Sequence, residues 1–160
     1  LNMKEKSLAI QAGILASAGL TTKIIGFVYR IPMANILGNT GNGIYSVAFG
    51  IYGIVLTLSS YSMPISVSKL VSEKAAVGSK EDSIKVFRVA MLVSVIVGAL
   101  AAMGLYFGAD GLAGVYNKTG LEMPLKVLAP TTFIVSVLGC FRGYFQGYGN
   151  MVPTALSQII

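Results

Sequence analysis

The chain contains no histidine and a single cysteine among its 160 residues, and only 11% of its residues are charged. The lack of histidine excludes most zinc and haem ligand sets, and one cysteine supports neither an internal disulfide nor an iron–sulfur cluster. In a typical soluble domain about a quarter of the residues are charged. The shortage of charge therefore argues against a soluble domain, and the shortage of metal ligands argues against most metal-dependent chemistry.

The sequence also lacks a catalytic constellation. It has no histidine base, no nucleophile motif, no glycine loop of the kind that holds phosphate groups and no cluster of carboxylates. Its acidic residues lie in expected loops or near the ends of apolar stretches. We predict that the chain is not an enzyme, that it has no catalytic or metal-binding residues and that it needs no cofactor. Coupling to an ion gradient or to the membrane potential is left open.

The sequence is rich in long apolar runs. Hydrophobic residues make up 54% of the chain, and its mean hydropathy is +0.75. A bilayer core of about 30 Å takes about 20 helical residues to cross, and only helices or closed barrels satisfy their backbone polar groups there. Continuous rather than alternating runs favour helices. Four such runs are almost free of charge: residues 8–28, 44–67, 89–107 and 127–141.

These runs predict an all-α fold, a polytopic membrane helical bundle. The sequence ends at Ile160 inside an apolar run, so we expect the chain to be the N-terminal transmembrane part of a longer protein. The expected spans cover residues 8–36, 44–68, 87–107 and 125–142, with the start of a fifth from residue 151.

The distribution of positive charge predicts an orientation in the membrane. The net charge is +6, and the excess of cations lies at Lys4 and Lys6, in the segment 69–88 and at Arg142. Under the positive-inside rule these segments are cytoplasmic. We therefore predict a multi-pass protein of the cell (cytoplasmic) membrane, with a cytoplasmic N-terminus and membrane lipids as partners. Because topology explains the spread of the cations, nucleic acid is not an expected partner.

A cleaved signal peptide is the competing interpretation of the N-terminus. Lys4 and Lys6, a short apolar run and the small residues 16–18 resemble such a peptide. However, the apolar run contains Gln11, and the apolar character continues past the candidate cleavage site. We therefore interpret this segment as the first span.

Lys23 and Arg30 are the energetically unfavourable feature of the first span. A cation at the bilayer centre is unfavourable by about 2.5–3.5 kcal/mol on insertion scales, and a spacing of seven residues places both on one helix face. We predict that they line a hydrated cavity and bind anionic cargo, since Arg suits bidentate phosphate recognition and Lys provides a point charge. The alternative is that Arg30 extends to the outer headgroups, which fits the deeper Lys23 less well.

Glycine, proline and aromatic residues give further local predictions. The segment 38–43 is predicted to be a glycine-rich turn, and the segment 143–150 a cytoplasmic turn. Pro64, preceded by several serines, predicts a bend in the second span. Rings near the outer end of that span are interpreted as interface anchors: Tyr45, Phe49 and Tyr52.

Small residues predict close packing in the third and fourth spans. Gly98 and Gly104 are expected to let a neighbouring helix approach the third span closely. Cys140 is interpreted as a small core residue, and Arg142 as a topology anchor at the end of the fourth span. Asn150 is predicted to cap the helix that follows.

Several motifs, in order, resemble those of one family. The chain is similar to the polysaccharide-biosynthesis and stage V sporulation protein B-like exporters of the multidrug/oligosaccharidyl-lipid/polysaccharide superfamily, to which MurJ/MviN-type lipid II flippases are related. The resemblance runs over nearly the whole chain. It rests on Ile25-Gly26-Phe27-Val28-Tyr29-Arg30-Ile31-Pro32, Gly43-Ile44-Tyr45, Ile51-Tyr52-Gly53, Met63-Pro64-Ile65-Ser66-Val67-Ser68-Lys69-Leu70-Val71-Ser72-Glu73, Phe141-Arg142-Gly143-Tyr144-Phe145-Gln146-Gly147-Tyr148 and Asn150-Met151-Val152-Pro153-Thr154.

The resemblance implies a MATE-like transporter of 12–14 helices in two bundles around a central cavity, with alternating access. It implies a lipid-linked anionic sugar as substrate, carried on a polyprenyl pyrophosphate, with Lys23 at a basic position of the motif. Relatives that flip lipid II usually have Arg then Asp where this chain has Tyr29 then Arg30. The acidic partner is therefore missing, which favours the sporulation-type branch.

The leading functional hypothesis is thus a flippase or exporter of a lipid-linked oligosaccharide or peptidoglycan precursor. One alternative is a cation-coupled multidrug antiporter of the same superfamily. Antiporters for cationic drugs tend to use carboxylates inside the membrane, whereas the interiors of these spans contain the cations Lys23 and Arg30 and no acid. The other alternative is a membrane scaffold that transports nothing.

Overall fold

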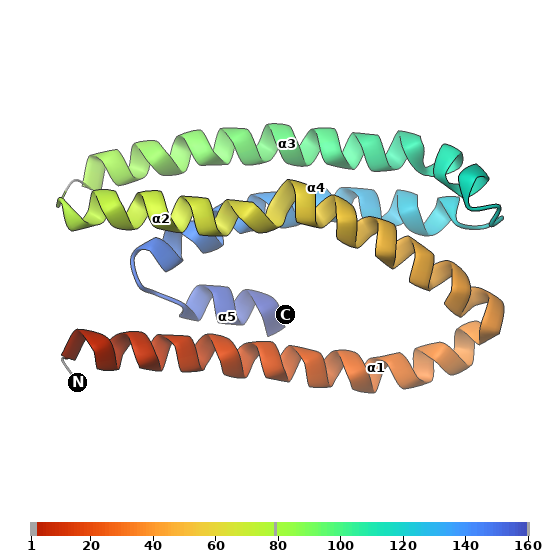
Figure 1. Ribbon diagram of the computed structural model, residues 1–160, viewed down its shortest axis with the longest axis horizontal. Coiled ribbons are helices and arrows are strands. Elements are labelled where there is room, and N and C mark those ends of the chain that lie inside the picture. Colours follow the sequence, from red (N-terminus) through yellow and green to blue (C-terminus); the bar gives the residue numbers. More distant parts are fainter. Residues whose placement is uncertain (1–2, 79, 160) are drawn as a thin grey trace.

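The computed structural model describes the backbone of residues 3–78 and 80–159 and, within these, the side chains of residues 9–59, 61–78 and 80–158. No strand occurs in this part of the chain, so the predicted all-α fold is confirmed. The helical elements (Figure 1) are α1 (Met3–Leu56), the π-helical turn η1 (Thr57–Tyr61), α2 (Ser62–Ala76), α3 (Lys80–Val115), α4 (Glu122–Gly147) and α5 (Val152–Ile159).

The lengths of the helices suit a membrane bundle. The 36 residues of α3 extend for about 54 Å, well beyond an apolar bilayer core of about 30 Å. The first four predicted spans fall on helical residues and the fifth helix begins at Val152, one residue after its predicted start; where the membrane begins and ends along the helices stays a prediction. Among the described residues, three helical stretches are long and apolar enough to cross a membrane: Ala9–Ala76, Lys80–Val115 and Glu122–Gly147.

The first of these stretches reverses direction at Gly38, which divides α1 into a first arm (residues 3–37) and a second arm (residues 39–56) (Figure 1). Gly38 has φ 62° and ψ −174°, a conformation that favours glycine because a Cβ would clash. Across the bend, Asn42 Nδ2 donates to Ala34 O at 2.8 Å, which satisfies a carbonyl that the end of a helix leaves without a partner. The prediction of a turn over 38–43 is wrong beyond Gly38, because residues 39–43 are helical.

Where Pro64 predicts a bend, the structure has the π-helical turn η1, just before that proline. Pro64 has no N–H for the carbonyl four residues earlier, and a π-turn accommodates such a mismatch by bonding one residue further along. The hydroxyl of Ser136 in α4 donates to Ser59 O at 3.1 Å. A carbonyl of the turn is therefore bonded by a neighbouring helix.

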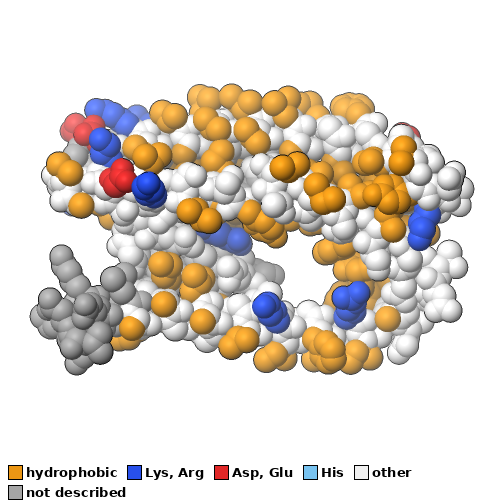
Figure 2. Space-filling model, in the orientation of Figure 1, with side chains coloured by type: hydrophobic (Ala, Val, Ile, Leu, Met, Phe, Trp, Pro, Cys, Tyr) orange, Lys and Arg blue, Asp and Glu red, His pale blue; other side chains and the backbone are white. Residues whose placement is uncertain are grey.

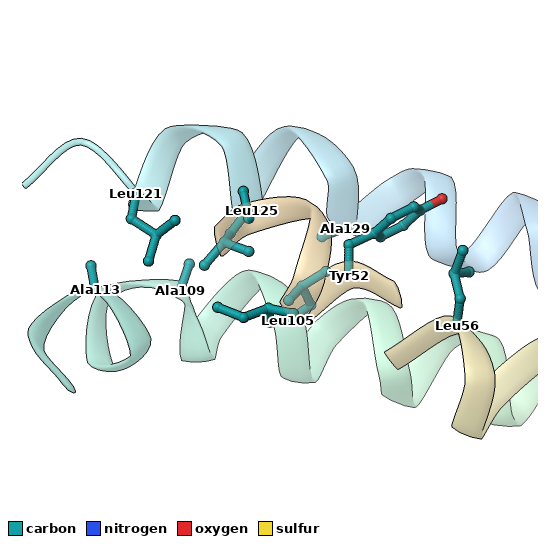
Figure 3. Packing of buried hydrophobic residues seen from close by; sticks show 10 residues of the cluster. Tyr52, Leu56, Leu105, Ala109, Ala113, Leu121, Leu125 and Ala129 are labelled. Carbon is teal, nitrogen blue, oxygen red and sulfur yellow. The ribbon is translucent and has the colours of Figure 1, made fainter. Parts of the chain in front are cut away.

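The larger apolar core joins the second arm of α1 to α3 and to the start of α4 (Figure 3). Its aliphatic side chains come from all three segments and include Leu56, Leu105 and Leu125. Tyr52 is only 8% exposed and belongs to this core. Its predicted role as an interface anchor is therefore wrong, because its ring packs between helices.

Glycine sets the closest approach between α3 and α4. A Cβ built on Gly98 would lie 2.7 Å from the Cβ of Ser136, whereas one on Gly104 would meet nothing within 4 Å. The close packing predicted for Gly98 is thus confirmed, and that for Gly104 is wrong within the described residues. Cys140, also on α4, is fully buried, as predicted for a small core residue.

Two further glycines bring α4 against α2. A Cβ on Gly143 would lie 2.8 Å from Pro64 O, and one on Gly147 would lie 2.7 Å from the Cβ of Val71. Small residues four apart allow this kind of close contact between membrane helices. The prediction of a turn over 143–150 is therefore wrong at its start, because α4 continues to Gly147. The helix that follows has the predicted cap, since Asn150 Oδ1 accepts from Val152 N at 3.2 Å.

The two ends of the bundle differ in charge. The N-terminus, the α2–α3 turn and the α4–α5 turn lie at one end, and the Gly38 bend and the α3–α4 loop lie at the other (Figure 1). Lys, Arg, Asp and Glu side chains gather where α2 meets α3 (Figure 2). The side chains of Lys4 and Lys6 lie outside the described residues, and which end is cytoplasmic stays a prediction. At the opposite end, Lys126 Nζ pairs with Asp110 at 2.8 Å and ties α4 to α3.

Alanine substitutions at Gly98 and Gly104 test this packing. Replacing a helical glycine by alanine favours the helix by about 1 kcal/mol. At Gly98 the methyl group would overlap Ser136, and overpacking destabilises by about 1–3 kcal/mol. We expect Gly98→Ala to lower the midpoint of thermal unfolding of the protein in detergent, and Gly104→Ala to leave it unchanged or raise it. Equal midpoints would show that α3 does not press against α4 at Gly98.

Candidate functional site

Lys23 and Arg30 lie on the first arm of α1, where every side chain from Leu20 to Pro32 is exposed. Their spacing of seven residues places them on one face of the helix, together with Gly26 and Met33. The helix therefore presents a row of two cations with small or flexible apolar residues between and beyond them.

No acidic side chain neutralises these cations within the described part of the chain. The ion pairs found there join Lys85 to Asp82 and Lys126 to Asp110. Both pairs lie near the ends of α3, away from Lys23 and Arg30 in the sequence and on other helices. An unpaired cation facing lipid is unfavourable, so the face that carries Lys23 and Arg30 requires water, an anion or a polar neighbour. In the same part of the chain, no three His, Cys, Asp or Glu residues lie close enough to hold a metal ion.

The first arm borders an opening between the helices. α5 lies between this arm and α4 at one side of the opening, and the bend at Gly38 closes the other side of the opening (Figure 1). In the space-filling view, Lys or Arg side chains of the first arm lie at the rim of the opening (Figure 2). Lys23 and Arg30 are the basic residues among the described side chains of that arm. Lys23 and Arg30 therefore belong to the arm that borders the opening.

A pocket of about 370 Å³ lies inside the bend, between the two arms of α1. The rings of Tyr45 and Phe49 in its wall have centroids 4.6 Å apart. The pocket includes Arg30 but not Lys23, which precedes Gly26 by three residues, or about 4.5 Å along the helix. It is lined by Gly26, Tyr29, Arg30 and Met33 from the first arm and by Tyr45, Ser46 and Phe49 from the second.

Two hydrogen bonds connect the first arm to α5 and its preceding turn. Gln11 Oε1 accepts from Met151 N at 2.9 Å, and the hydroxyl of Thr22 lies 3.0 Å from Gln158 O. Thr22 is the neighbour of Lys23 in the sequence. The bond to Gln158 thus fixes α5 close to the start of the cationic row.

Arg142 is a candidate residue that the sequence analysis treated as a topology anchor at the end of the fourth span. It lies instead inside α4, half-buried, and donates from Nε to Ser157 Oγ at 2.9 Å and from Nη2 to Ser157 O at 3.0 Å. Ser157 of α5 is adjacent to Gln158, the residue that Thr22 contacts. Arg142 therefore contacts, from the α4 side, the same end of α5 that Thr22 contacts from α1.

The fold and the site define a class: a multi-pass α-helical membrane protein with unpaired cations beside an opening between its helices. The comparison with known families is more specific. Residues 8–160 match the family described as "Polysaccharide biosynthesis protein", and the chain belongs to that family.

Three relatives from Bacillus subtilis (strain 168) each align over 92% of this chain. The chain is 29% identical to stage V sporulation protein B and covers 29% of it. It is 32% identical to the uncharacterized membrane protein YabM and covers 27% of it, and it is 29% identical to lipid II flippase MurJ and covers 29% of it. The chain thus spans less than a third of the length of these relatives. No solved structure matches it.

The accessibility of position 23 tests whether the cationic face meets water. We expect Lys23→Cys, in a Cys140→Ser background, to react readily with a charged thiol reagent, because this face borders the opening. Val28→Cys is the matched control: Val28 lies on the opposite face of the same arm and is 60% exposed. It should react much more slowly, because that face is expected to meet lipid. Equally slow labelling at both positions would place Lys23 in lipid.

Proposed function

We propose that this chain forms part of a flippase or exporter that moves a lipid-linked oligosaccharide or peptidoglycan precursor across the cytoplasmic membrane by alternating access. The carrier would be a polyprenyl pyrophosphate, and no chemical change of the cargo is proposed. The observation that carries the proposal is the exposed, unpaired row of Lys23 and Arg30. The family of the chain and its similarity to a relative named lipid II flippase support it.

In the complete protein, we propose 12–14 helices in two bundles, with the opening beside the first arm as part of a central cavity. The polar headgroup of the cargo would cross there while its lipid tail stays in the bilayer. A pyrophosphate is strongly disfavoured in hydrocarbon, as any isolated charge is. Lys23 and Arg30 would offset that penalty with charge-assisted contacts, each contributing about 1.5–3 kcal/mol.

Arg142 is suited to take part in the same site. Its present partners are a hydroxyl and a carbonyl, both uncharged, so its positive charge is not cancelled. Guanidinium groups bind phosphate oxygens in a bidentate manner. We therefore include Arg142, with Lys23 and Arg30, among the residues proposed to attract the anionic headgroup.

Substitution of Lys23 tests the proposal in the full-length protein. Losing one charge-assisted contact should weaken cargo binding by roughly 10- to 100-fold. We expect Lys23→Ala to abolish or sharply reduce transport of a pyrophosphate-linked sugar lipid in vesicles, and Lys23→Arg to retain part of it. The alternative in which Arg30 extends to headgroups predicts a milder loss for Arg30→Ala.

Expression and insertion of each variant in the membrane are matched before rates are compared. Full transport by the Lys23→Ala/Arg30→Ala double variant would contradict the proposal and would leave both residues as topology or interface anchors. A membrane scaffold that transports nothing predicts no transport by the unmodified protein either.

The proposed orientation has a separate test. We propose that the end of the bundle with the α2–α3 turn is cytoplasmic, because the cation excess of the segment 69–88 lies there. Val77 lies in that turn, and Thr119 lies in the α3–α4 loop at the other end; both are exposed. In a Cys140→Ser background, an impermeant thiol reagent should label Thr119→Cys in intact cells and Val77→Cys only after permeabilisation. The reverse pattern would invert the topology.

A further inference from the structure

The pocket inside the α1 bend differs in composition from the other hollows of the molecule. Of its seven lining residues, four carry a polar group and three carry an aromatic ring. The groove between α2 and α3, by contrast, is lined mainly by valine, leucine, alanine and methionine. Small-molecule sites combine apolar and aromatic walls with a few placed polar groups. The pocket in the bend has that composition, whereas the α2–α3 groove resembles a surface for lipid tails or another helix.

We infer that this pocket binds the sugar ring that is attached to the pyrophosphate of the cargo. The inference rests on the proposed function and adds a specific subsite to it. A sugar ring has hydroxyl groups at its edge and a weakly apolar C–H face. Aromatic side chains provide flat, apolar area with a polar end in the case of tyrosine. The pocket provides both: the Phe49 ring beside Tyr45, and the polar groups of Tyr29, Arg30 and Ser46.

The position of the pocket along α1 supports separate places for the pyrophosphate and for the sugar. Lys23 and Arg30 are about 10 Å apart along the helix axis, so a pyrophosphate close to Lys23 would contact Arg30 only at the end that faces the next group of the cargo. Thr22, the neighbour of Lys23 in the sequence, contacts the end of α5, and Arg142 contacts the adjacent Ser157. Arg30 belongs to the pocket. A pyrophosphate near Lys23 would therefore place the next group of the cargo, its first sugar, at the mouth of the pocket, with Arg30 between the two.

The size of the pocket agrees with a single ring. Its volume of about 370 Å³ is near the lower limit of about 300–1,000 Å³ for small-molecule sites. The pocket is therefore suited to one sugar rather than to a whole oligosaccharide. The remaining sugars of a longer cargo would extend into the opening.

Ligands with and without a sugar separate this subsite from the site for the pyrophosphate. The probes are a polyprenyl pyrophosphate that carries one N-acetylhexosamine and the same polyprenyl pyrophosphate without a sugar. The full-length protein in detergent is titrated with each, and every variant is compared with the unmodified protein on the same probe. We expect Phe49→Leu, which keeps apolar bulk and loses the ring, to weaken binding of the sugar-bearing probe by roughly 5- to 10-fold. Binding of the sugar-free probe should stay within about twofold, because no sugar ring stacks there.

Phe27→Leu is the matched control, because Phe27 is an exposed ring on the first arm that does not line the pocket. It should leave both affinities unchanged. Phe49→Tyr keeps the ring and should retain binding of both probes, which separates loss of the ring from a fault in folding. Equal losses for both probes with Phe49→Leu would overturn the inference and assign Phe49 to the support of the fold.

Lys23→Ala distinguishes failure of the inference from failure of the proposed function. If Lys23→Ala weakens both probes while Phe49→Leu weakens neither, the sugar subsite is wrong and the proposed function stands. If Lys23→Ala weakens neither probe, the proposed pyrophosphate site is wrong, and the sugar subsite that rests on it is wrong as well.

Discussion

At Gly38 the backbone takes φ 62° and ψ −174°, and the side chain of Asn42 bonds back to Ala34 O. In a straight helix, residues 30 and 45 would lie about 22 Å apart. The bend instead brings Arg30 and Tyr45 into the wall of one pocket. A side chain at position 38 would disfavour this conformation. Without the bend, the pocket that both arms line would not form.

The rest of the molecule contrasts with the first arm. α2, α3 and α4 approach one another closely at Gly98, Gly143 and Gly147, where even a methyl group would overlap a neighbour. The middle of the first arm buries no side chain between Leu20 and Pro32. The cations of the candidate site therefore lie on a segment whose side chains are exposed within this chain, next to a tightly packed body of α2, α3 and α4.

Sequence reasoning predicted what depends on local periodicity. Continuous apolar runs indicated helices, and the seven-residue spacing indicated that Lys23 and Arg30 share a face. It failed where one residue type serves two purposes. Glycine breaks helices but also permits close packing, so Gly143 and Gly147 suggested a turn where α4 continues. Aromatic rings favour both membrane interfaces and cores, so Tyr52 was misplaced. The pocket was not predictable, because contact between Arg30 and the second arm depends on the direction of the bend, which no local pattern specifies.

The partners of Arg142 show how a protein can hold a cation ready for an anion. An acidic partner would fix the guanidinium but would also cancel its charge, and an incoming anion would then have to displace that acid. Ser157 offers a hydroxyl and a carbonyl instead, which orient the group without neutralising it. A phosphate would gain a charge-assisted contact with this guanidinium, and the neutral acceptors would remain available when the phosphate left. The arrangement therefore suits reversible binding of an anion, because no acid has to be displaced and none has to be restored.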